Sequence, residues 1–556
     1  MTSSSGPATG GRTDSDVAMS EVSSDMAGRN ASRDLASGDA SSDPTVGADQ
    51  LAGAVGAPGR AGPPGFNAGA RWARYLPPVV ALALSLWGST TPSFWRDEAA
   101  TLAAVRRPFG DLITMLGNVD AVHAAYYIMV WPLVQLAGAG EFVVRLPSAL
   151  AIAVAAAAVA AIGRRLISPW AGMLAGLMFA VLPAVSRYGQ EARSYAMVIA
   201  VAAIASYLLV RVVSAEPVRR RRWLMAYGAS LAAVGILNIF ALLLIPAHAV
   251  TLVLECRRRA GGRESKRLLV GWLAAAAVSV IVASPLLVLG WSERGQISWL
   301  TVNKSSSGIG TLLTLDGSIL VTFAVVAVIG IALVVGSETG RERLRKEWPR
   351  PLVDLTVPWL ILPPVILLTG SLITPLYTSR YILMCLPALA LIGGAAMTAL
   401  GRVGGPAALA VVLLAGLTAQ LAQRAPAGHY DDIRSLDKVL VAQARPGDVV
   451  LYTNPNAESF GAAYPYGLDA LRNIALRQAA IPSGTLAGTT VPLAVIRQRL
   501  AHVSRVWIVE INKEVLPPEV DGMSGSPLGP ALVGLPFHRV KIWREHGDWL
   551  LFYARD

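Results

Sequence analysis

The sequence predicts an all-α polytopic membrane protein with a small α/β domain after the last span. Three observations lead to this fold class. The 556 residues are 54% hydrophobic and only 15% charged, whereas soluble domains carry roughly 25% charged residues. Uncharged runs long enough to cross a bilayer, about 20 residues each, recur through the middle of the chain. Residues 424–556 instead combine charged helical stretches with short apolar runs.

Residues 1–70 are expected to form a disordered cytoplasmic tail. They are rich in Ser, Gly, Ala and Asp, and hold 4 Lys and Arg against 8 Asp and Glu. A segment of this composition cannot bury enough apolar surface to offset the entropy lost on ordering. No apolar stretch closely follows the first methionine, so no signal peptide is predicted.

Residues 71–423 are predicted to form a transmembrane domain of 11–13 helices. The run 223–254 is too long for one crossing, and Asn238 near its middle predicts two shorter helices joined by a turn. The uncharged runs are 75–95, 121–140, 146–163, 166–186, 194–210, 223–254, 268–292, 317–337, 355–379, 381–401 and 403–423.

Basic loops set the expected orientation of these spans. Arg and Lys cluster in 211–222, 256–267 and 341–350, which should therefore face the cytoplasm. Counting spans from these loops puts 186–193, 293–316, 374–380 and everything after 423 outside. With the tail inside and 91–120 outside, however, 121–140 and 146–163 cannot both be simple crossings.

The C-terminal segment 424–556 is predicted to be an extracytoplasmic α/β domain. The stretches 447–454 and 505–512 are typical of strands, and 540–555 is typical of a hairpin that turns at 546–548. Charged helical stretches lie near 430–445 and 493–502.

Polar groups gather in three predicted external segments beside the spans: "WRDEAATL" (95–102), "SRYGQEARSYA" (186–196) and "PLYTSRYIL" (375–383). Ionisable residues at membrane depth are costly, so several of them together indicate a functional site. Ordinary contact of single Arg and Tyr side chains with lipid headgroups is the alternative. The candidate residues are Asp97, Glu98, His123, Arg187, Gln190, Glu191, Arg193, Tyr195, Tyr377, Arg380 and Tyr381.

This set of residue types suits sugar transfer from a lipid phosphate carrier. A carboxylate can take the proton of an acceptor hydroxyl. Arginines match a phosphate leaving group in charge and geometry. Tyrosine and tryptophan offer flat faces and hydroxyls to a sugar.

The chain also resembles a known family over about 90–400. It is similar to the GT-C fold membrane glycosyltransferases, in the branch of the dolichyl- or polyprenyl-phosphate-mannose mannosyltransferases and the lipid A aminoarabinose transferase. The matching segments, in order, are "WRDEAATL", "HAAYYIMVW" (123–131), "EFVVRLPSAL" (141–150), "GQEARSYA" (189–196) and "SRYILMCLPALAL" (379–391). Ala124 and Ala125 stand where the family often has prolines, and Asn238 where relatives often carry His-Tyr.

The resemblance implies a role for each matching residue. Asp97 would be the catalytic base of an inverting transfer, with Glu98 as its neighbour. His123 would stand near the site, Arg380 would contact the donor phosphate, and Gln190, Glu191 and Arg193 would line the roof. The implied partners are a polyprenyl-phosphate sugar donor, most simply mannose, an envelope glycan or glycolipid acceptor such as lipomannan or lipoarabinomannan, and the lipid bilayer.

The sequence leaves alternatives open for the acceptor, the sugar and the class of protein. The acceptor could be Ser or Thr of secreted proteins, the sugar could be arabinofuranose or aminoarabinose, and a lipid or sugar transporter is the alternative of another class. No cofactor is required by the sequence, although Asp97, Glu98 and Glu191 could share a divalent cation. A nucleic-acid partner is not expected, because the +12 net charge comes from basic loops between apolar runs.

Overall fold

A computed structural model describes residues 64–292, 315–338, 348–373, 377–510, 534–545 and 548–555, except for residues 260 and 316. Outside the described residues lie the expected tail up to residue 63, nearly all of the expected external segment 293–316 and most of the basic loop 341–350.

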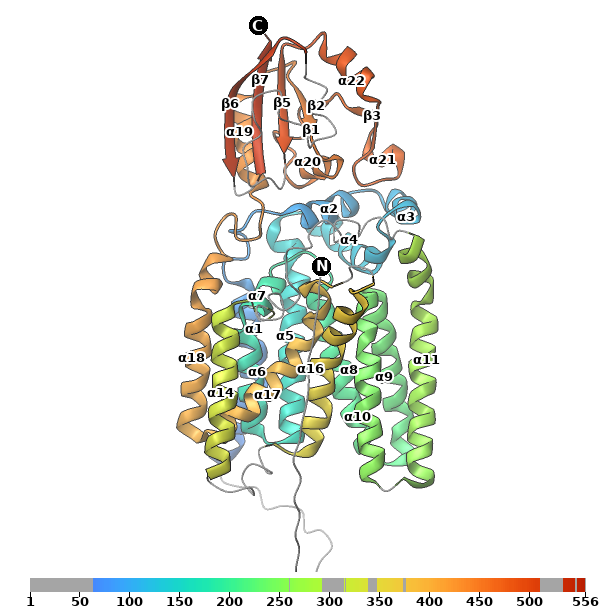
Figure 1. Ribbon diagram of the computed structural model, residues 1–556, viewed down its shortest axis with the longest axis vertical. Coiled ribbons are helices and arrows are strands. Elements are labelled where there is room, and N and C mark those ends of the chain that lie inside the picture. Colours follow the sequence, from blue (N-terminus) through green and yellow to red (C-terminus); the bar gives the residue numbers. More distant parts are fainter. Residues whose placement is uncertain are drawn as a thin grey trace, which may run out of the picture. The chain divides into compact units, whose positions relative to one another are not determined.

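Long helices make up the membrane part of the chain (Figure 1). Among the described residues, eight helices are long and apolar enough to cross a membrane, and a ninth results if the bent pair α6 (Pro169–Val181) and α7 (Pro183–Gly189) is one span. The eight are α5 (Glu141–Leu166), α8 (Tyr195–Ser214), η2 (Ile239–Leu243) with α10 (Leu244–Arg258), α11 (Gly262–Ser292), α14 (Ile319–Glu338), α16 (Arg350–Gly370), η4 (Ser379–Cys385) with α17 (Leu386–Ala399), and α18 (Gly401–Ala422).

This number is smaller than the 11–13 spans expected from the sequence. With the bent pair counted as one span the number is nine, and two more helices, α1 (Pro64–Leu86) and α9 (Pro217–Leu237), would bring it to 11. The run of four arginines that ends at Arg222 occupies the start of α9 and shortens its apolar part. The predicted break in 223–254 is confirmed, because α9 ends at Leu237 and Asn238 caps η2 by accepting a hydrogen bond from the Phe240 N–H at 2.9 Å.

The order of crossings around 121–163 follows from helix lengths. Helix α5 is 26 residues long, whereas α4 (Ala124–Ala137) has only 14. With the 3-10 turn η1 (Ala121–His123) before it, the helical segment has 17 residues and extends about 27 Å, less than the roughly 30 Å bilayer core. Helices α2 (Arg96–Val105), α3 (Phe109–Asn118) and α4 lie together at one end of the bundle (Figure 1). The segment 121–140 is therefore the one that does not cross.

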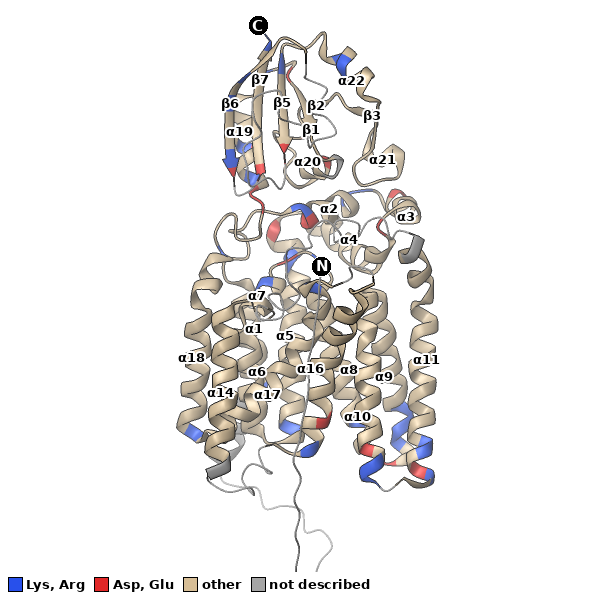
Figure 2. Ribbon diagram, in the orientation of Figure 1, with Lys and Arg blue, Asp and Glu red and all other residues tan. Residues whose placement is uncertain are grey.

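Basic residues gather at the other end of the bundle. Figure 2 shows Lys and Arg at the ends of α10 and α11 that lie farthest from α2. Arg164 and Arg165 end α5, and Arg257 and Arg258 end α10. This is the distribution expected of a multispan protein whose α2 end faces away from the cytoplasm.

Glycine allows α5 and α6 to approach closely. A Cβ on Gly172 would lie 2.4 Å from the Ala160 carbonyl oxygen and 2.6 Å from the Arg164 nitrogen. A Cβ on Gly163 would lie 2.8 Å from the Gly172 Cα. Small residues at such crossings let helix backbones pack against each other in membranes.

Replacing Gly172 with Ala is expected to destabilise the helix pair by about 1–3 kcal/mol, since overpacking forces the backbones apart. The measurement is the melting temperature of the purified protein in detergent. Gly110→Ala in α3 is the matched control, because nothing lies within 4 Å of its added Cβ. An unchanged melting temperature for Gly172→Ala would contradict the close crossing.

The C-terminal residues form a five-stranded sheet in the order β2-β1-β5-β7-β6 (Figure 1). The expected strands and hairpin are confirmed as β1 (Val449–Tyr452), β5 (Arg505–Glu510), β6 (Phe537–Glu545) and β7 (Asp548–Arg555). The expected helical stretches are α19 (Ile433–Gln443) and α22 (Leu493–Leu500). Unpredicted are β2 (Arg472–Asn473), β3 (Leu476–Gln478), β4 (Thr489–Thr490), α20 (Ser459–Ala463) and α21 (Ala480–Ser483), which are too short to show a period.

The region after α18 contacts the α2 end of the membrane part through specific bonds. The Phe94 N–H donates to the Tyr464 hydroxyl at 3.0 Å, and Arg107 Nη2 donates to the Thr485 carbonyl at 2.5 Å. Phe94 and Phe460 share one hydrophobic core. Helix α2 is thus held by contacts just before its start and just after its end.

Candidate active site

Three adjacent charged residues at the start of α2 form three separate ion pairs. Arg96 pairs with Asp431 of the segment after α18 at 2.7 Å. Asp97 pairs with Arg380 of η4 at 2.6 Å, and Glu98 pairs with Arg145 of α5 at 2.6 Å. Three consecutive positions on a helix point in different directions, so each reaches a different element. The two acids also lie in the first turn of α2, where carboxylates stabilise a helix.

Asp97 and Arg380 are the pair in which both side chains are partly exposed. Their side chains are 23% and 22% exposed. Burial raises the pKa of Asp97, but the charges of Arg193 and Arg380 outweigh it, so the pKa lies below its usual value. The carboxylate is therefore ionised and held by the two cations.

Arg193 joins Asp97 to a second group of polar side chains. Its Nη1 contacts the Asp97 carbonyl oxygen at 3.5 Å and donates to the Tyr127 hydroxyl at 3.1 Å. Its Nη2 lies 2.8 Å from His123 Nε2. Because a guanidinium can only donate, His123 Nε2 must accept, which puts the ring proton on Nδ1. Burial and the charge of Arg193 lower the pKa of His123 to about 4, so the ring is neutral.

Asp120 completes this group. The Tyr127 hydroxyl donates to Asp120 Oδ2 at 2.5 Å, and Asp120 Oδ1 lies 3.7 Å from His123 Nε2. Asp120 has a positive φ of 63°, an unusual conformation for a residue other than glycine. Such backbone geometry is found where the surroundings hold it and often at functional sites.

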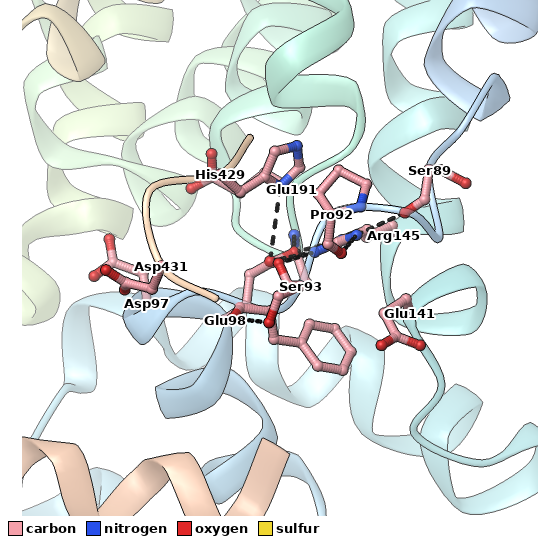
Figure 3. Close-up of polar contacts among 12 residues, drawn as sticks. Ser89, Pro92, Ser93, Asp97, Glu98, Glu141, Arg145, Glu191, His429 and Asp431 are labelled. Atoms are coloured by element: carbon pink, nitrogen blue, oxygen red, sulfur yellow. Dashed lines mark hydrogen bonds and ion pairs between the residues drawn. The ribbon is translucent and has the colours of Figure 1, made fainter. Parts of the chain in front are cut away.

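Glu98 lies outside this partly exposed pair and is fully buried. Figure 3 shows its contacts with Arg145. Arg145 Nε and Nη2 donate to its two oxygens at 2.8 and 2.6 Å, and the Ala192 N–H donates to Oε1 at 2.9 Å. The same guanidinium donates to the carbonyls of Ser89, Pro92 and Ser93. Burial raises the pKa of Glu98 but Arg145 lowers it further, and the resulting pKa is far below the usual range. Glu98 thus ties α2 to α5 and to the loop before α2.

Glu191 and Arg187 form a fourth ion pair, 2.8 Å apart. Burial raises the pKa of Glu191 to about 7, although Arg187 opposes this effect. The Arg187 guanidinium lies over the rings of Trp95 and Tyr430, at 5.8 and 5.3 Å from their centroids. Trp95 also lies beneath Arg380, at 5.6 Å, so it borders both cations.

The other residues predicted for the site make packing contacts or hydrogen bonds with neighbouring elements. Tyr195 packs edge-on against Tyr188 at 5.5 Å. Tyr381 stacks on Phe240 at 4.2 Å. The Tyr377 N–H donates to Ser371 at 2.8 Å. Gln190 turns away and donates to the Trp87 carbonyl at 2.7 Å, next to the end of α1.

Asp97, Glu98 and Glu191, the carboxylates considered as ligands of a divalent cation, do not come together in a cation site. Asp97, Glu98 and Glu191 each face a different arginine. Within the described ranges, no three His, Cys, Asp or Glu side chains come together in a way that could hold a metal ion. The divalent cation considered from the sequence therefore does not fit these residues.

Several residues of this region were missed from the sequence. Arg145 directly precedes the uncharged run 146–163, and an arginine buried at the start of a span is itself a signal. Asp431 and the buried His429, whose Nδ1 lies 3.9 Å from Glu98 Oε2, come from a segment more than 300 positions away in the chain. No spacing pattern could have connected them with α2.

Comparison with known proteins agrees with this architecture. Residues 124–289 match the family model for dolichyl-phosphate-mannose-protein mannosyltransferase. ArnT from Cupriavidus metallidurans, in the apo state, superposes with a TM-score of 0.56 at 14% identity, covering 86% of this chain and 97% of ArnT. The chain has the GT-C fold of membrane glycosyltransferases. The fold and the enzyme class expected from the sequence are thereby confirmed.

A second ArnT structure, bound to undecaprenyl phosphate, gives the same TM-score of 0.56 and the same coverage of this GT-C chain. No curated protein matches the sequence.

Proposed function

We propose that this GT-C protein transfers a sugar, most simply mannose, from a polyprenyl-phosphate carrier to an extracytoplasmic envelope glycan or glycolipid of the lipomannan or lipoarabinomannan kind. The observation that carries the proposal is the 2.6 Å pair of Asp97 and Arg380. It combines a carboxylate outside the spans with a guanidinium at the start of one. A carboxylate can deprotonate the acceptor, and a guanidinium can hold the phosphate of the donor.

The transfer would be a single displacement. Asp97 takes the proton of an acceptor hydroxyl while the acceptor oxygen attacks the anomeric carbon. The bond between that carbon and the phosphate oxygen breaks, and polyprenyl phosphate leaves with the negative charge. One base suffices for such a reaction, and the anomeric configuration is inverted.

The ion pair of Asp97 and Arg380 fits a reaction in which the donor binds before the acceptor. Arg380 and Arg193 hold the pKa of Asp97 down, which makes it a weak base. A donor phosphate bound to the same arginines would neutralise their charge, and the burial of Asp97 would then raise its pKa. Donor binding thus prepares the base for the acceptor.

An apolar cavity supports a lipid-linked donor. It has a volume of about 310 Å³ and is lined by side chains of α14, α16 and α17, including Val325, Pro364 and Leu389. Leu389 follows Arg380 by nine positions in one helical segment, or roughly 15 Å. A phosphate at Arg380 could therefore have its prenyl chain in this cavity.

Mannose is supported by the name of the matching family model, and a polyprenyl carrier by the ligand in the second ArnT structure. Transfer of arabinofuranose or aminoarabinose, or transfer to Ser or Thr of proteins, uses the same base and the same phosphate site. A test therefore gives membranes carrying this protein each labelled donor with lipoglycan, glycolipid and peptide acceptors. Label found in peptide alone would contradict the envelope acceptor.

The site is proposed to lie outside the cytoplasm. Reporter fusions after residues 140 and 190 are expected to give extracytoplasmic signals, because the basic ends of α5 and α10 lie at the opposite end of the bundle. A fusion after Gly261, between α10 and α11, is the matched control and should report the cytoplasm. A cytoplasmic signal at residue 190 would overturn the location.

Arg380→Gln is expected to weaken donor binding and to change the pH profile. A charge-assisted bond to phosphate contributes about 1.5–3 kcal/mol, so the donor KM should rise roughly tenfold or more. Removing the cation also lets burial raise the pKa of Asp97, so the rate should fall at a higher pH on acidification than in the wild type. Rates measured from pH 4.5 to 8 check this, and an unshifted acid limb would contradict the pairing. Arg350→Gln, at the start of α16, is the charge-matched control.

A further inference from the structure

A polar pocket lies where α5 and α8 end and α9 begins, away from α2. It has a volume of about 190 Å³, and its lining includes Arg165, Arg211, Ser214, Glu216, Arg219 and Trp223. Arg165 lies in the last turn of α5 and Arg211 in the last turn of α8, whereas Arg219 lies in the first turns of α9. Arg145, near the other end of α5, is 20 positions before Arg165, or about 30 Å along the helix. The pocket is therefore separate from the candidate active site.

Arg211 is held in a fixed position at the pocket. Its guanidinium lies 4.1 Å from the centroid of the Trp223 ring, and its Nη1 donates to the Tyr207 hydroxyl at 3.0 Å. Stacking on tryptophan orients a guanidinium without neutralising it. Among the described residues, the other N–H groups of Arg211 make no hydrogen bond, so they can donate to an anion.

The three pocket arginines differ from the other basic residues nearby. Arg220 pairs with Glu264 at 2.8 Å, and Arg259 pairs with Glu255 at 2.8 Å. Across the described ranges, Arg165, Arg211 and Arg219 form no ion pair, and Glu216 is the one carboxylate that lines the pocket. The pocket consequently keeps an excess of positive charge.

The backbone adds to this charge. Helix α9 is 21 residues long and begins at the pocket, with Pro217 in its first turn. A helix N-terminus carries a partial positive charge and directs N–H groups towards an anion. Arginines and a helix N-terminus together match the oxygens of a phosphate group.

We propose that this pocket binds the phosphate of an anionic lipid in the membrane leaflet opposite the candidate active site. The pocket lies at the ends of three membrane helices, at the depth of lipid headgroups, and basic pockets between such helices bind anionic headgroups. Trp223, on its border, is a residue type common at this depth. Arg219, the first of the four arginines at the start of α9, thus has a binding role besides setting orientation.

The test is native mass spectrometry of the full-length protein with phosphatidylglycerol or phosphatidylcholine added. The double variant Arg165→Gln/Arg219→Gln removes two charges that make no other bonds among the described residues. Arg164→Gln/Arg221→Gln removes two charges from the same turns but outside the pocket. We expect phosphatidylglycerol to bind with roughly tenfold to thirtyfold lower affinity in the first variant and unchanged affinity in the second.

Two outcomes would overturn the proposal. One is equal binding of phosphatidylcholine and phosphatidylglycerol to the wild type, and the other is an equal loss in both double variants. Inorganic phosphate distinguishes the source of the anion. Displacement of phosphatidylglycerol by millimolar phosphate would assign the pocket to free phosphate and contradict the lipid, whereas retention of the lipid supports it.

Discussion

Asp97→Asn is expected to abolish most sugar transfer while leaving the protein folded. General-base catalysis contributes about 10²- to 10⁴-fold, so the rate should fall by roughly a thousandfold at saturating donor. The Asp97–Arg380 pair is partly exposed, and such pairs contribute about 0–1 kcal/mol to stability. The measurement compares initial transfer rates and melting temperatures of wild-type and variant protein.

The matched control for this variant is Asp111→Asn. Asp111 also lies in the first turn of a short helix, α3, but outside the group around Arg380. It should retain wild-type activity. Full activity in Asp97→Asn would contradict the assignment of Asp97 as the base, and an equal loss in Asp111→Asn would mean that the assay reports folding.

Arg145→Met is expected to damage the fold rather than the chemistry. The side chains of Arg145 and Glu98 are 1% and 0% exposed. Removing one partner of a buried ion pair leaves an uncompensated charge, which costs about 3–5 kcal/mol. We expect a sharp drop in the yield of folded protein and in its melting temperature.

Adding a substitution of Glu98 to Arg145→Met tests whether the lost stability comes from the unpaired buried charge. In Arg145→Met/Glu98→Gln no charge remains buried at this position, so part of the stability should return. The recovery should be incomplete, because the carbonyls of Ser89, Pro92 and Ser93 lose their donor. If the double variant folds, its transfer rate should approach that of the wild type. A well-folded but inactive protein would instead place Glu98 in the chemistry.

The contrast between Asp97 and Glu98 shows what could not be predicted from the sequence. Two adjacent carboxylates look equivalent in "WRDEAATL", and both were candidates for catalysis. The helix directs them about 100° apart, so one meets an arginine at an accessible edge and the other an arginine in the core. Which partner each side chain meets depends on tertiary packing, and no local pattern carries that information.

Topology was easier to predict than the site for a physical reason. Basic loops, apolar runs and the break at Asn238 are local properties of the chain, and they predict the order of the helices and an expected orientation. The short helix α4 was the one ambiguous element, because its run 121–140 is as uncharged as a true span. Its helical length became known only from the structure.

The other contacts that the sequence did not predict involve partners far apart in the chain. Asp431 and Tyr464 hold the start of α2 from a region over 300 positions later. The C-terminal sheet itself followed from its strand patterns, but its bonds to Arg96 and Phe94 did not. The role of this region is therefore partly to position the first turn of α2.

The most direct test of the account uses purified protein in proteoliposomes with a polyprenyl-phosphate mannose donor. We predict that free polyprenyl phosphate appears only when an acceptor is present, together with a mannosylated product of inverted anomeric configuration. Asp97→Asn should form neither product at a comparable rate. Movement of intact donor between leaflets without release of polyprenyl phosphate would contradict the account and indicate a transporter.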